Sequence, residues 1–470
     1  MKLKILLISS PQIESISATY PLGLCYIAAV LKERNYDVEI FDYSKRPYSA
    51  KLFLQEVKKS NPDFIGFTVY SCFYNAIKEM IRILRNEFDM AKIIIGGPHV
   101  SALPAYSLED MHADFAVVGE AELVMPEIIR RAGERCASFD DIKGLAYWSG
   151  NSLKFNPGCN LVLDLDRLPF PDRGILPINS YNETIGHIFI AKTPVAPILT
   201  SRGCPHHCIF CSTHVIHGRV FRRRSASNVV DEIEYLIRKY NVKEINFYDD
   251  TFSESPEHAI DICKEMTIRK LNISWRTAVG LRLSTINEEL LGYFKASGCY
   301  QLSFGIESFS ERLLSQIRKP ISKFQIKEKI ELIRRCGIET LGFFILGLPT
   351  DTEQSIWETI NFARNSGLDF IIFTPLIPFP GSAIFEDIYN SKNKQLINWD
   401  HFNFNYGFKF ELSKIPAAKL RKIYIFSYLY CHFAPKRIIK IMMNILFLRK
   451  INFLKIIKSF YYIIIKNLCN

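Results

Sequence analysis

The stretch APILTSRGCPHHCIFC, residues 196–211, joins a short apolar run to three closely spaced cysteines. The apolar run is typical of a buried β-strand. Behind it, Cys204, Cys208 and Cys211 form a C-x-x-x-C-x-x-C pattern. Thiolates are soft ligands that select iron–sulfur clusters or zinc, and a four-iron cluster normally takes four of them. Because this pattern offers three, one iron would stay open to an exogenous ligand if no further side chain joins.

A structural zinc ion is the alternative for the same cysteines. Three cysteines and one histidine form one of the common structural zinc sites, and the nearby histidines are His206, His207, His214 and His217. Zinc sites of this kind usually come with a second C-x-x-C pair, which this stretch does not have. The position of the motif, after the first of a long series of strands, also favours the cluster.

Strand and helix patterns alternate from residue 196 onward. The helix predicted at residues 352–365 carries a start signal, because Thr350 and Glu353 have the spacing of a capping box. Six consecutive units predict a partial (βα)6 barrel, and on such barrels the chemistry lies at the carboxyl-terminal rim, where Cys204 falls. The predicted strands are residues 196–200, 244–248, 273–277, 300–305, 340–346 and 369–376.

The first 150 residues show a separate alternation of strand and helix patterns. It predicts a doubly wound, flavodoxin-like parallel sheet, in which ligands bind at the carboxyl ends of the strands. Gly96 and Gly97 would let the backbone come close to a ligand there, although a tight turn explains them equally well. The predicted strands are residues 5–9, 38–42, 64–70, 93–95 and 115–118, and the loops that qualify are residues 9–21, 68–71, 96–101 and 119–122.

The remaining regions differ in composition. Residues 151–185 are rich in Pro and Asp and are predicted to link the first domain, residues 1–150, to the barrel, residues 186–400. Residues 401–470 are predicted to be a basic helical extension, because from Leu412 onward the chain has twelve Lys or Arg and no Asp or Glu. This local excess, within a net charge of +11, suggests a membrane surface or an acidic partner rather than nucleic acid. Helices that simply pack on the barrel explain it at least as well.

Neither a membrane span nor a secretory signal is expected. The longest uncharged stretch of the basic extension, residues 423–435, is shorter than the roughly 18 to 20 residues that cross a bilayer. The chain opens on a strand pattern rather than on a signal peptide, and nine of its twelve cysteines are scattered singly, as core residues are. These features predict a cytoplasmic protein, with peripheral membrane contact through the extension as a further possibility.

The cysteine motif, placed after the first strand of a six-unit barrel, resembles the radical S-adenosylmethionine (SAM) superfamily. Further motifs resemble its branch with an N-terminal cobalamin-binding domain: PLGL at 21–24, GGPH at 96–99, VGEAE at 118–122, YDDTF at 248–252, GIES at 305–308 and GLP at 347–349. Thr350 and Asp351 depart from that pattern, because relatives commonly show Gly-Glu there. The resemblance implies a 4Fe-4S cluster on the three cysteines, whose open iron chelates SAM and whose electron splits it to a 5′-deoxyadenosyl radical.

The resemblance also implies roles for individual residues. Phe210 would pack on the adenine of SAM, and three carboxylates at strand ends, Asp249, Asp250 and Glu307, would accept its hydrogen bonds. The residues implied for cobalamin are Thr68, Gly96, Gly97 and His99. Arg276 and Arg282 are candidates for a carboxylate of the substrate or of SAM, with solvation at the surface equally plausible. The basic run of Arg219, Arg222, Arg223 and Arg224 is predicted to be a solvated loop.

The lower face of the cobalamin is expected to lack a histidine ligand. Many cobalamin proteins ligate cobalt through a D-x-H-x-x-G motif after the first strand. Asp110 and His112 imitate that motif, but the glycine is missing and the position in the chain is different. We interpret the match as coincidence, and the radical branch also includes enzymes without this ligand.

The implied function is a cobalamin-dependent radical methyltransferase, forming a carbon–methyl bond on a small or lipid-like molecule, with flavodoxin or ferredoxin as electron donor. A related cyclase activity stays open. A radical methylthiotransferase would need three more cluster cysteines in the first domain, and the apolar or helical surroundings of Cys25, Cys72 and Cys136 argue against that role. A non-catalytic, membrane-associated metal-binding protein is the alternative from a different class.

Overall fold

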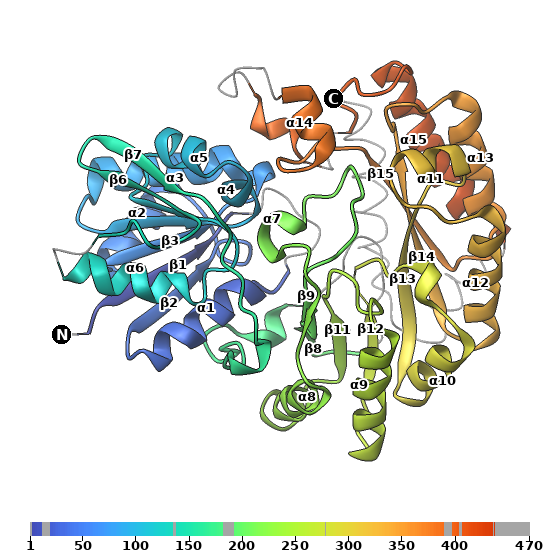
Figure 1. The fold of residues 1–470 in the computed structure, drawn as a ribbon, viewed down its shortest axis with the longest axis horizontal. Coiled ribbons are helices and arrows are strands. Elements are labelled where there is room, and N and C mark those ends of the chain that lie inside the picture. Colours follow the sequence, from blue (N-terminus) through green and yellow to red (C-terminus); the bar gives the residue numbers. More distant parts are fainter. Residues whose placement is uncertain are drawn as a thin grey trace.

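In a computed structural model, the chain is described for residues 2–11, 19–134, 138–181, 192–277, 279–389, 397–403, 407–435 and 437. Two largely parallel sheets, each with helices packed against it, lie next to each other (Figure 1). The first sheet is built by the amino-terminal part of the chain and the second by residues 195–375.

The first sheet has the strand order β2-β1-β3-β4-β5-β6-β7. Its first five strands are parallel, and the order 2-1-3-4-5 is that of a flavodoxin-like sheet, which confirms the predicted fold class. These strands are β1 (Lys4–Ser9), β2 (Asp37–Asp42), β3 (Phe64–Thr68), β4 (Lys92–Gly96) and β5 (Phe115–Val117).

An antiparallel hairpin extends this sheet beyond the predicted strands. It consists of β6 (Leu145–Ser149) and β7 (Ser152–Asn156), joined by a tight turn in which Gly150 has a φ of +61°. The sequence predicts a linker from residue 151, whereas β7 is paired within the first sheet. The side chains of β7 are largely exposed, and its two apolar residues, Leu153 and Phe155, alternate with polar ones, so the strand has no continuous apolar run like those of the predicted strands.

Helices cover both faces of the first sheet because its strands are apolar on both faces. Along β1, Leu7 belongs to the core on the face of α1 (Leu22–Glu33) and α6 (Val124–Gly133). The neighbouring Ile8 belongs to the core of the opposite face. The helices on that face are α2 (Ala50–Ser60), α3 (Tyr74–Glu87), α4 (Pro98–Ala102) and α5 (Pro104–Asp110).

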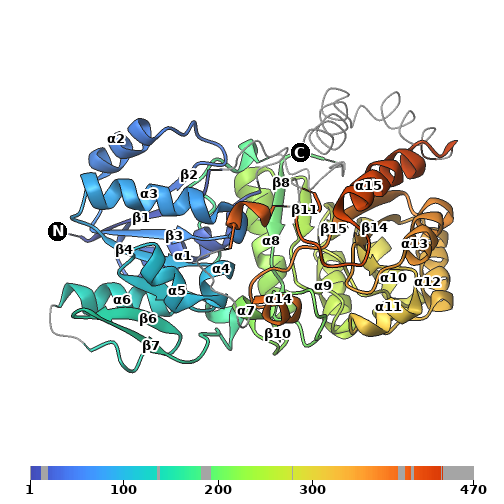
Figure 2. The same ribbon diagram turned by 90° about the horizontal axis from the view of Figure 1, so that it is seen from above.

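The second sheet has six parallel strands in sequential order, which confirms the predicted partial barrel. The strands are β8 (Val195–Ile198), β11 (Glu244–Phe247), β12 (Ser274–Thr277), β13 (Cys299–Glu307), β14 (Glu339–Leu346) and β15 (Phe370–Pro375). The helices that follow them are α8 (Ala226–Tyr240), α9 (Pro256–Ile268), α10 (Glu288–Ala296), α11 (Glu311–Gln316), α12 (Lys323–Arg335) and α13 (Glu353–Asn365). All of these helices lie outside the curved sheet (Figure 2).

The start of α13 corrects one prediction. Its capping box is formed by Thr352 and Ser355, not by Thr350 and Glu353. Asp351 explains the shift, because its carboxylate accepts hydrogen bonds from the backbone at the end of β14 and from the Ser355 hydroxyl. Two later helices are α14 (Ala383–Tyr389) and α15 (Ala417–His432), the second of which packs against α13 and β15.

A short ribbon stands between the two sheets. Strands β9 (Ser201–Arg202) and β10 (Arg222–Arg223) pair antiparallel, and the loop between them contains the three cysteines and α7 (His214–His217). Helix α7 contacts α4 of the first domain and lies between the two halves of the molecule in both views (Figures 1 and 2). Short 3-10 helices are η1 (Ser71–Phe73), η2 (Leu165–Arg167), η3 (Ile178–Ser180), η4 (Leu283–Thr285) and η6 (Trp399–His401). None of the helices described is both long and apolar enough to cross a lipid bilayer.

Candidate functional site

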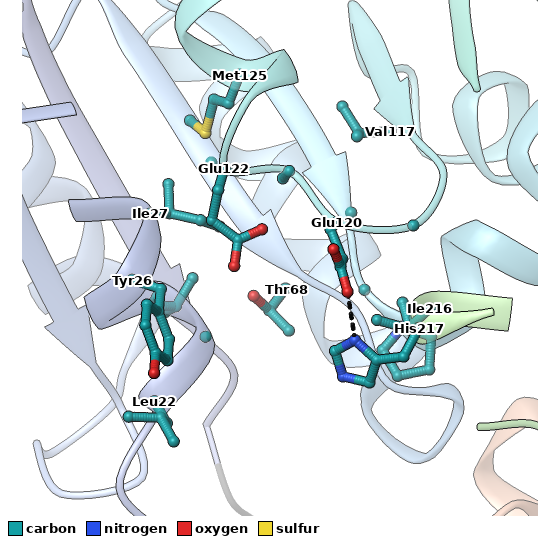
Figure 3. Close-up of a pocket in the computed structure, with 18 of the residues that line it drawn as sticks. Leu22, Tyr26, Ile27, Thr68, Val117, Glu120, Glu122, Met125, Ile216 and His217 are labelled. Atoms are coloured by element: carbon teal, nitrogen blue, oxygen red, sulfur yellow. Dashed lines mark hydrogen bonds and ion pairs between the residues drawn. The ribbon is translucent and has the colours of Figure 1, made fainter. Parts of the chain in front are cut away.

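A cavity of about 460 Å³ lies where the two domains meet (Figure 3). The first domain contributes the ends of its parallel strands, and the barrel contributes the segment directly after the third cysteine. From the first domain, the lining includes Leu7, Gly66, Thr68, Tyr70, Gly96, Gly97, Gly119, Glu120, Glu122 and Met125. From the barrel, it includes Arg202, Ser212, Thr213, Ile216, His217, Tyr248 and Asp250.

Three of the four residues predicted for cobalamin line this cavity: Thr68, Gly96 and Gly97. Gly97 has a φ of +96°, and a Cβ atom there would lie 2.9 Å from the backbone nitrogen of Val69. Only glycine fits such a position without strain. Gly97 is therefore required by the backbone at the edge of the cavity, whereas a Cβ atom on Gly96 would meet only the carbonyl oxygen of Val117, at 3.8 Å.

His99, the fourth residue predicted for cobalamin, lies in the core rather than in the cavity wall. Its ring is fully buried between Tyr74 and Trp399, at centroid distances of 4.4 and 4.5 Å. Its Nδ1 atom lies 2.9 Å from the Ser71 hydroxyl, and burial lowers its pKa to about 3. Packing between a helix of the first domain and η6, far along the chain, decides this placement.

The three cysteines lie on the loop that follows β9, at the carboxyl end of the first barrel strand. All three are half-buried free thiols. Gly203, just before the first of them, has a φ of +88°, and a Cβ atom there would lie 2.2 Å from the carbonyl oxygen of Val220. The amide of Cys211 donates to the carbonyl of Cys208, and the amide of Ile209 donates to the carbonyl of Ile317. The loop is thus fixed by its backbone to the barrel.

Burial disfavours the thiolate form of two of these cysteines. Burial raises the pKa of Cys204 to about 11 and also raises the pKa of Cys208. Among the residues described, no three His, Cys, Asp or Glu side chains converge so that they could hold one metal ion. A four-iron cluster does not need its ligands to converge on one ion, because each thiolate binds a different corner iron and loses its proton on binding.

The two neighbouring aspartates after β11 have different environments. One oxygen of the buried Asp249 accepts hydrogen bonds from the amides and hydroxyls of Thr200 and Ser201. Burial raises its pKa to about 6, against the opposing effect of those hydrogen bonds. Asp250 lines the cavity and accepts one hydrogen bond from the amide of Gly203, at 3.1 Å. Asp249 therefore holds the turn before the cysteines, and Asp250 is the one that faces the open space.

Glu307 ends β13 with a φ of +66° and forms an ion pair with Lys319, at 2.8 Å. The sequence predicts no role for Lys319. It lies near Cys208, and its positive charge acts to lower the pKa of that thiol, against the larger effect of burial. A Cβ atom on Gly305 would lie 2.4 Å from a Glu307 carboxylate oxygen, so the glycine makes room for this pair. Phe210 is half-buried and packs against the main core of the barrel.

The two arginines predicted as carboxylate partners near the third barrel strand, Arg276 and Arg282, have different environments. Arg276 is fully buried inside the barrel, 3.5 Å from Glu244, so solvation at the surface is excluded for it. Arg282 is half-buried and lines a small cleft together with Gly305 and Lys319. Of the two, Arg282 is thus the one closer to the Glu307 side of the site.

The basic run after α7 is only partly the solvated stretch that the sequence predicts: Arg223 is exposed, but two of its neighbours are not. Arg222 and Arg224 are both only 5% exposed. Arg222 forms two hydrogen bonds, of 2.7 and 2.8 Å, with Glu120 of the first domain, and Arg224 pairs with Glu232 at 2.6 Å. For Arg222 the prediction was wrong because its negative partner comes from a distant part of the chain; for Arg224 the partner lies on the following helix, α8.

Glu120, like Lys319, lies at the site but has no role predicted from the sequence. Its carboxylate also lies 2.9 Å from Nδ1 of His217, a contact visible in Figure 3, and accepts a hydrogen bond from the amide of Val162. Burial would raise its pKa, but the hydrogen bonds from His217 and Arg222 and the charge of Arg202 hold that pKa at about 2. The motif at residues 118–122 marks the loop, but not its partners in the barrel.

Comparisons with protein families and known structures agree with this geometry. The model of the radical SAM superfamily matches residues 198–363, and that of the B12 binding domain matches residues 14–129. An uncharacterized methyltransferase of Pyrococcus horikoshii is 31% identical over 445 residues, which cover 93% of this chain and 94% of the relative. The cytidylyl-2-hydroxyethylphosphonate methyltransferase of Streptomyces wedmorensis is 28% identical, covering 78% of both chains.

Solved structures show the same fold. The radical SAM methyltransferase TsrM from Kitasatospora setae, with cobalamin and a [4Fe-4S] cluster bound, matches with a TM-score of 0.68 and 19% identity, over 83% of this chain and 75% of that chain. The cobalamin-dependent radical enzyme OxsB matches with a TM-score of 0.67 and 19% identity, over 83% and 56% of the two chains. The chain therefore belongs to the radical SAM superfamily, in the branch of cobalamin-dependent methyltransferases, whose cofactors are SAM, a 4Fe-4S cluster and cobalamin.

Proposed function

We propose that the chain holds the 4Fe-4S cluster on Cys204, Cys208 and Cys211 and uses it to cleave SAM reductively in the course of a methylation. One observation carries the proposal: the cysteine loop and the B12-binding domain share a cavity. Ser212 and Thr213, which directly follow Cys211, line the same space as Thr68 and Gly96. Groups bound on the two sides would thus be neighbours, which is what passing a methyl group between them requires.

The residues of this cavity fit a corrinoid. Its floor is made by aliphatic and thioether side chains, among them Leu7, Ile94 and Met125, and its edge by glycines and carboxylates. A corrinoid has an apolar macrocycle with amide groups around its margin, so it matches an apolar floor with acceptors at the edge. When bound, cobalamin supplies the methyl group, and the reduced cluster supplies the electron that splits SAM into methionine and a 5′-deoxyadenosyl radical.

The residues of the chain would bind and orient SAM. Phe210 offers an aromatic face to the adenine, while Asp250 and Glu307 offer carboxylates to the ammonium or ribose groups. Asp249, with its Oδ1 atom already accepting four hydrogen bonds, would act by fixing the turn before Cys204. Lys319 places a positive charge next to Glu307, where a carboxylate of SAM or of the substrate would find a partner.

We infer further that the substrate is a small or lipid-like molecule that is methylated at carbon, and that flavodoxin or ferredoxin donates the electrons. The printed name of the Streptomyces relative, a cytidylyl phosphonate methyltransferase, supports a small-molecule substrate. A contact of the basic C-terminal extension with a membrane stays a prediction, since residues 438–470 lie outside the described part of the chain. The methylthiotransferase alternative needs further cluster cysteines in the first domain, and one candidate, Cys25, is fully buried in the core. Another candidate, Cys136, lies outside the described residues.

Anaerobic purification tests the proposal. The protein is expected to be brown, to contain about four irons and four sulfides per chain and a corrinoid after reconstitution, and to release 5′-deoxyadenosine from SAM with dithionite. Cys208→Ala should lose both the colour and the cleavage. Cys336→Ala, which changes a half-buried cysteine at the end of α12, is the matched control and should lose neither. A colourless zinc protein, or cleavage that persists in Cys208→Ala, would refute the proposal.

A further inference from the structure

The cysteine loop is one excursion of the chain whose two ends are paired with each other. It leaves the barrel at β9 and returns at β10, where Arg202 lies opposite Arg222 in the antiparallel register. The amide of Cys204 donates to the carbonyl of Gly218 near the other end of the excursion. The position of the β9–β10 ribbon therefore sets the position of the cysteines.

The charges that neutralise this ribbon come from the first domain. Arg202 and Arg222 are 4% and 5% exposed, and each needs a buried negative partner. Glu120 accepts two hydrogen bonds from Arg222 and lies 3.5 Å from Arg202, and Glu122 accepts a hydrogen bond from Arg202 at 2.8 Å. Both carboxylates are themselves buried and belong to the loop after β5, at the edge of the cavity.

Glu120 is the node of these contacts. Besides the two arginines it holds His217, at the end of α7 and still within the cysteine loop, and the amide of Val162 in the segment that connects the domains. Its own amide donates to the carbonyl of Asn160 in the same segment. One side chain thus joins the wall of the cavity, the connecting segment and both ends of the cysteine loop.

We propose that Glu120 is a positioning residue that couples the corrinoid cavity to the cluster loop, so that the place of the cysteines depends on a carboxylate of the B12-binding domain. The inference rests on the proposed function for its chemical meaning, but the coupling itself is a property of the protein. Because misplacement of reacting groups by about 1 Å can slow a reaction about a hundredfold, loss of this carboxylate should disturb SAM cleavage although Glu120 is not among the residues that bind SAM.

The test compares Glu120→Gln with Asp114→Asn in the full-length chain. Asp114 is a matched control, because it also binds two cations, Arg85 and Lys92, and one backbone amide, that of Ile93. It lies directly before β5, whereas Glu120 follows that strand. Hydrogen–deuterium exchange of residues 203–221 is the first readout and needs no cofactor. The second is 5′-deoxyadenosine release from SAM with dithionite, measured without substrate after anaerobic reconstitution.

Glu120→Gln should speed the exchange of residues 203–221 about tenfold or more and slow 5′-deoxyadenosine release about tenfold or more. Asp114→Asn should leave both within about twofold of the unaltered protein. The inference is overturned if Glu120→Gln leaves both readouts unchanged, or if Asp114→Asn changes them equally. If Glu120→Gln does not fold, Arg222→Lys, which keeps the charge but loses the paired hydrogen bonds, replaces it with the same expectations. Failure of the unaltered protein to cleave SAM would count against the proposed function, while the exchange result would still decide the coupling.

Discussion

The carboxylate of Asp249 accepts hydrogen bonds from both the amide and the hydroxyl of Ser201, at 2.5 and 2.6 Å. The same oxygen accepts two more from Thr200, so one buried atom fixes the turn between β8 and β9. The cysteine loop begins directly after this turn. Asp249, which follows β11, thus fixes the backbone just before the cysteine loop. Its neighbour Asp250 lines the cavity.

Replacing Asp249 by alanine should destabilise the protein strongly. Each buried donor left without an acceptor costs about 1 to 3 kcal/mol, so we expect the free energy of unfolding to fall by at least about 2 kcal/mol. Asp250→Ala, which removes a single hydrogen bond to Gly203, should cost less. Urea unfolding of the cofactor-free variants measures both values, and equal losses would contradict the assigned role.

Gly203→Ala should prevent the cysteine loop from adopting its backbone conformation. The residue has a φ of +88°, and an added Cβ would lie 2.2 Å from the carbonyl oxygen of Val220, which belongs to the backbone and cannot move aside cheaply. We expect less than about half the iron content of the unaltered protein after reconstitution. Gly292→Ala, in α10 with open space around the added methyl group, is the control and should retain its iron. Full iron content in Gly203→Ala would show that the loop does not need this conformation.

Gly66→Val should weaken corrinoid binding without affecting the cluster. Gly66 lies in β3 on the floor of the cavity, and a Cβ atom there would lie 2.9 Å from Leu7 and 3.0 Å from Met125, both of which line the same space. The added methyl groups fill part of the volume, so the affinity for hydroxocobalamin should fall about tenfold or more. Spectroscopic titration measures the affinity, and iron analysis provides the control. An unchanged affinity would place the corrinoid elsewhere.

Glu120 should make stability depend on pH in the acid range. In the folded protein its pKa is about 2, below the ordinary value of 4.5, because the hydrogen bonds from His217 and Arg222 and the charge of Arg202 outweigh the effect of burial. A lowered carboxylate pKa stabilises the fold above the unfolded value, and this stabilisation disappears as the pH falls toward the folded value. The difference in unfolding free energy between the unaltered protein and Glu120→Gln should therefore be larger at about pH 7 than at about pH 3. A difference that does not change across this range would contradict the ion-pair role.

The sequence predicts the features that depend on neighbouring residues. The six barrel strands and the five parallel strands of the first sheet were found because buried strands read as continuous apolar runs, and each observed strand overlaps its prediction. The cysteine motif was equally visible, since its spacing lies within eight residues. The strand β7 was missed because its exposed side chains carry no such pattern.

Features that depend on contacts between distant segments were not predictable from one sequence. Arg222 looks like part of a solvated basic run, and only its pairing with Glu120, 102 positions away, explains its burial. His99 stands in a glycine motif typical of a cofactor loop, yet its contacts with Trp399 place it in the core. In both cases, the local residues are compatible with two environments, and tertiary packing selects one of them.

The electron paramagnetic resonance spectrum of the dithionite-reduced protein, recorded with and without SAM, tests the central claim most directly. If three cysteines hold a four-iron cluster with one open corner, the reduced protein gives a cluster signal whose g values shift when SAM binds at the open iron. A signal that SAM leaves unchanged, or a protein that contains zinc and gives no signal, would contradict the account.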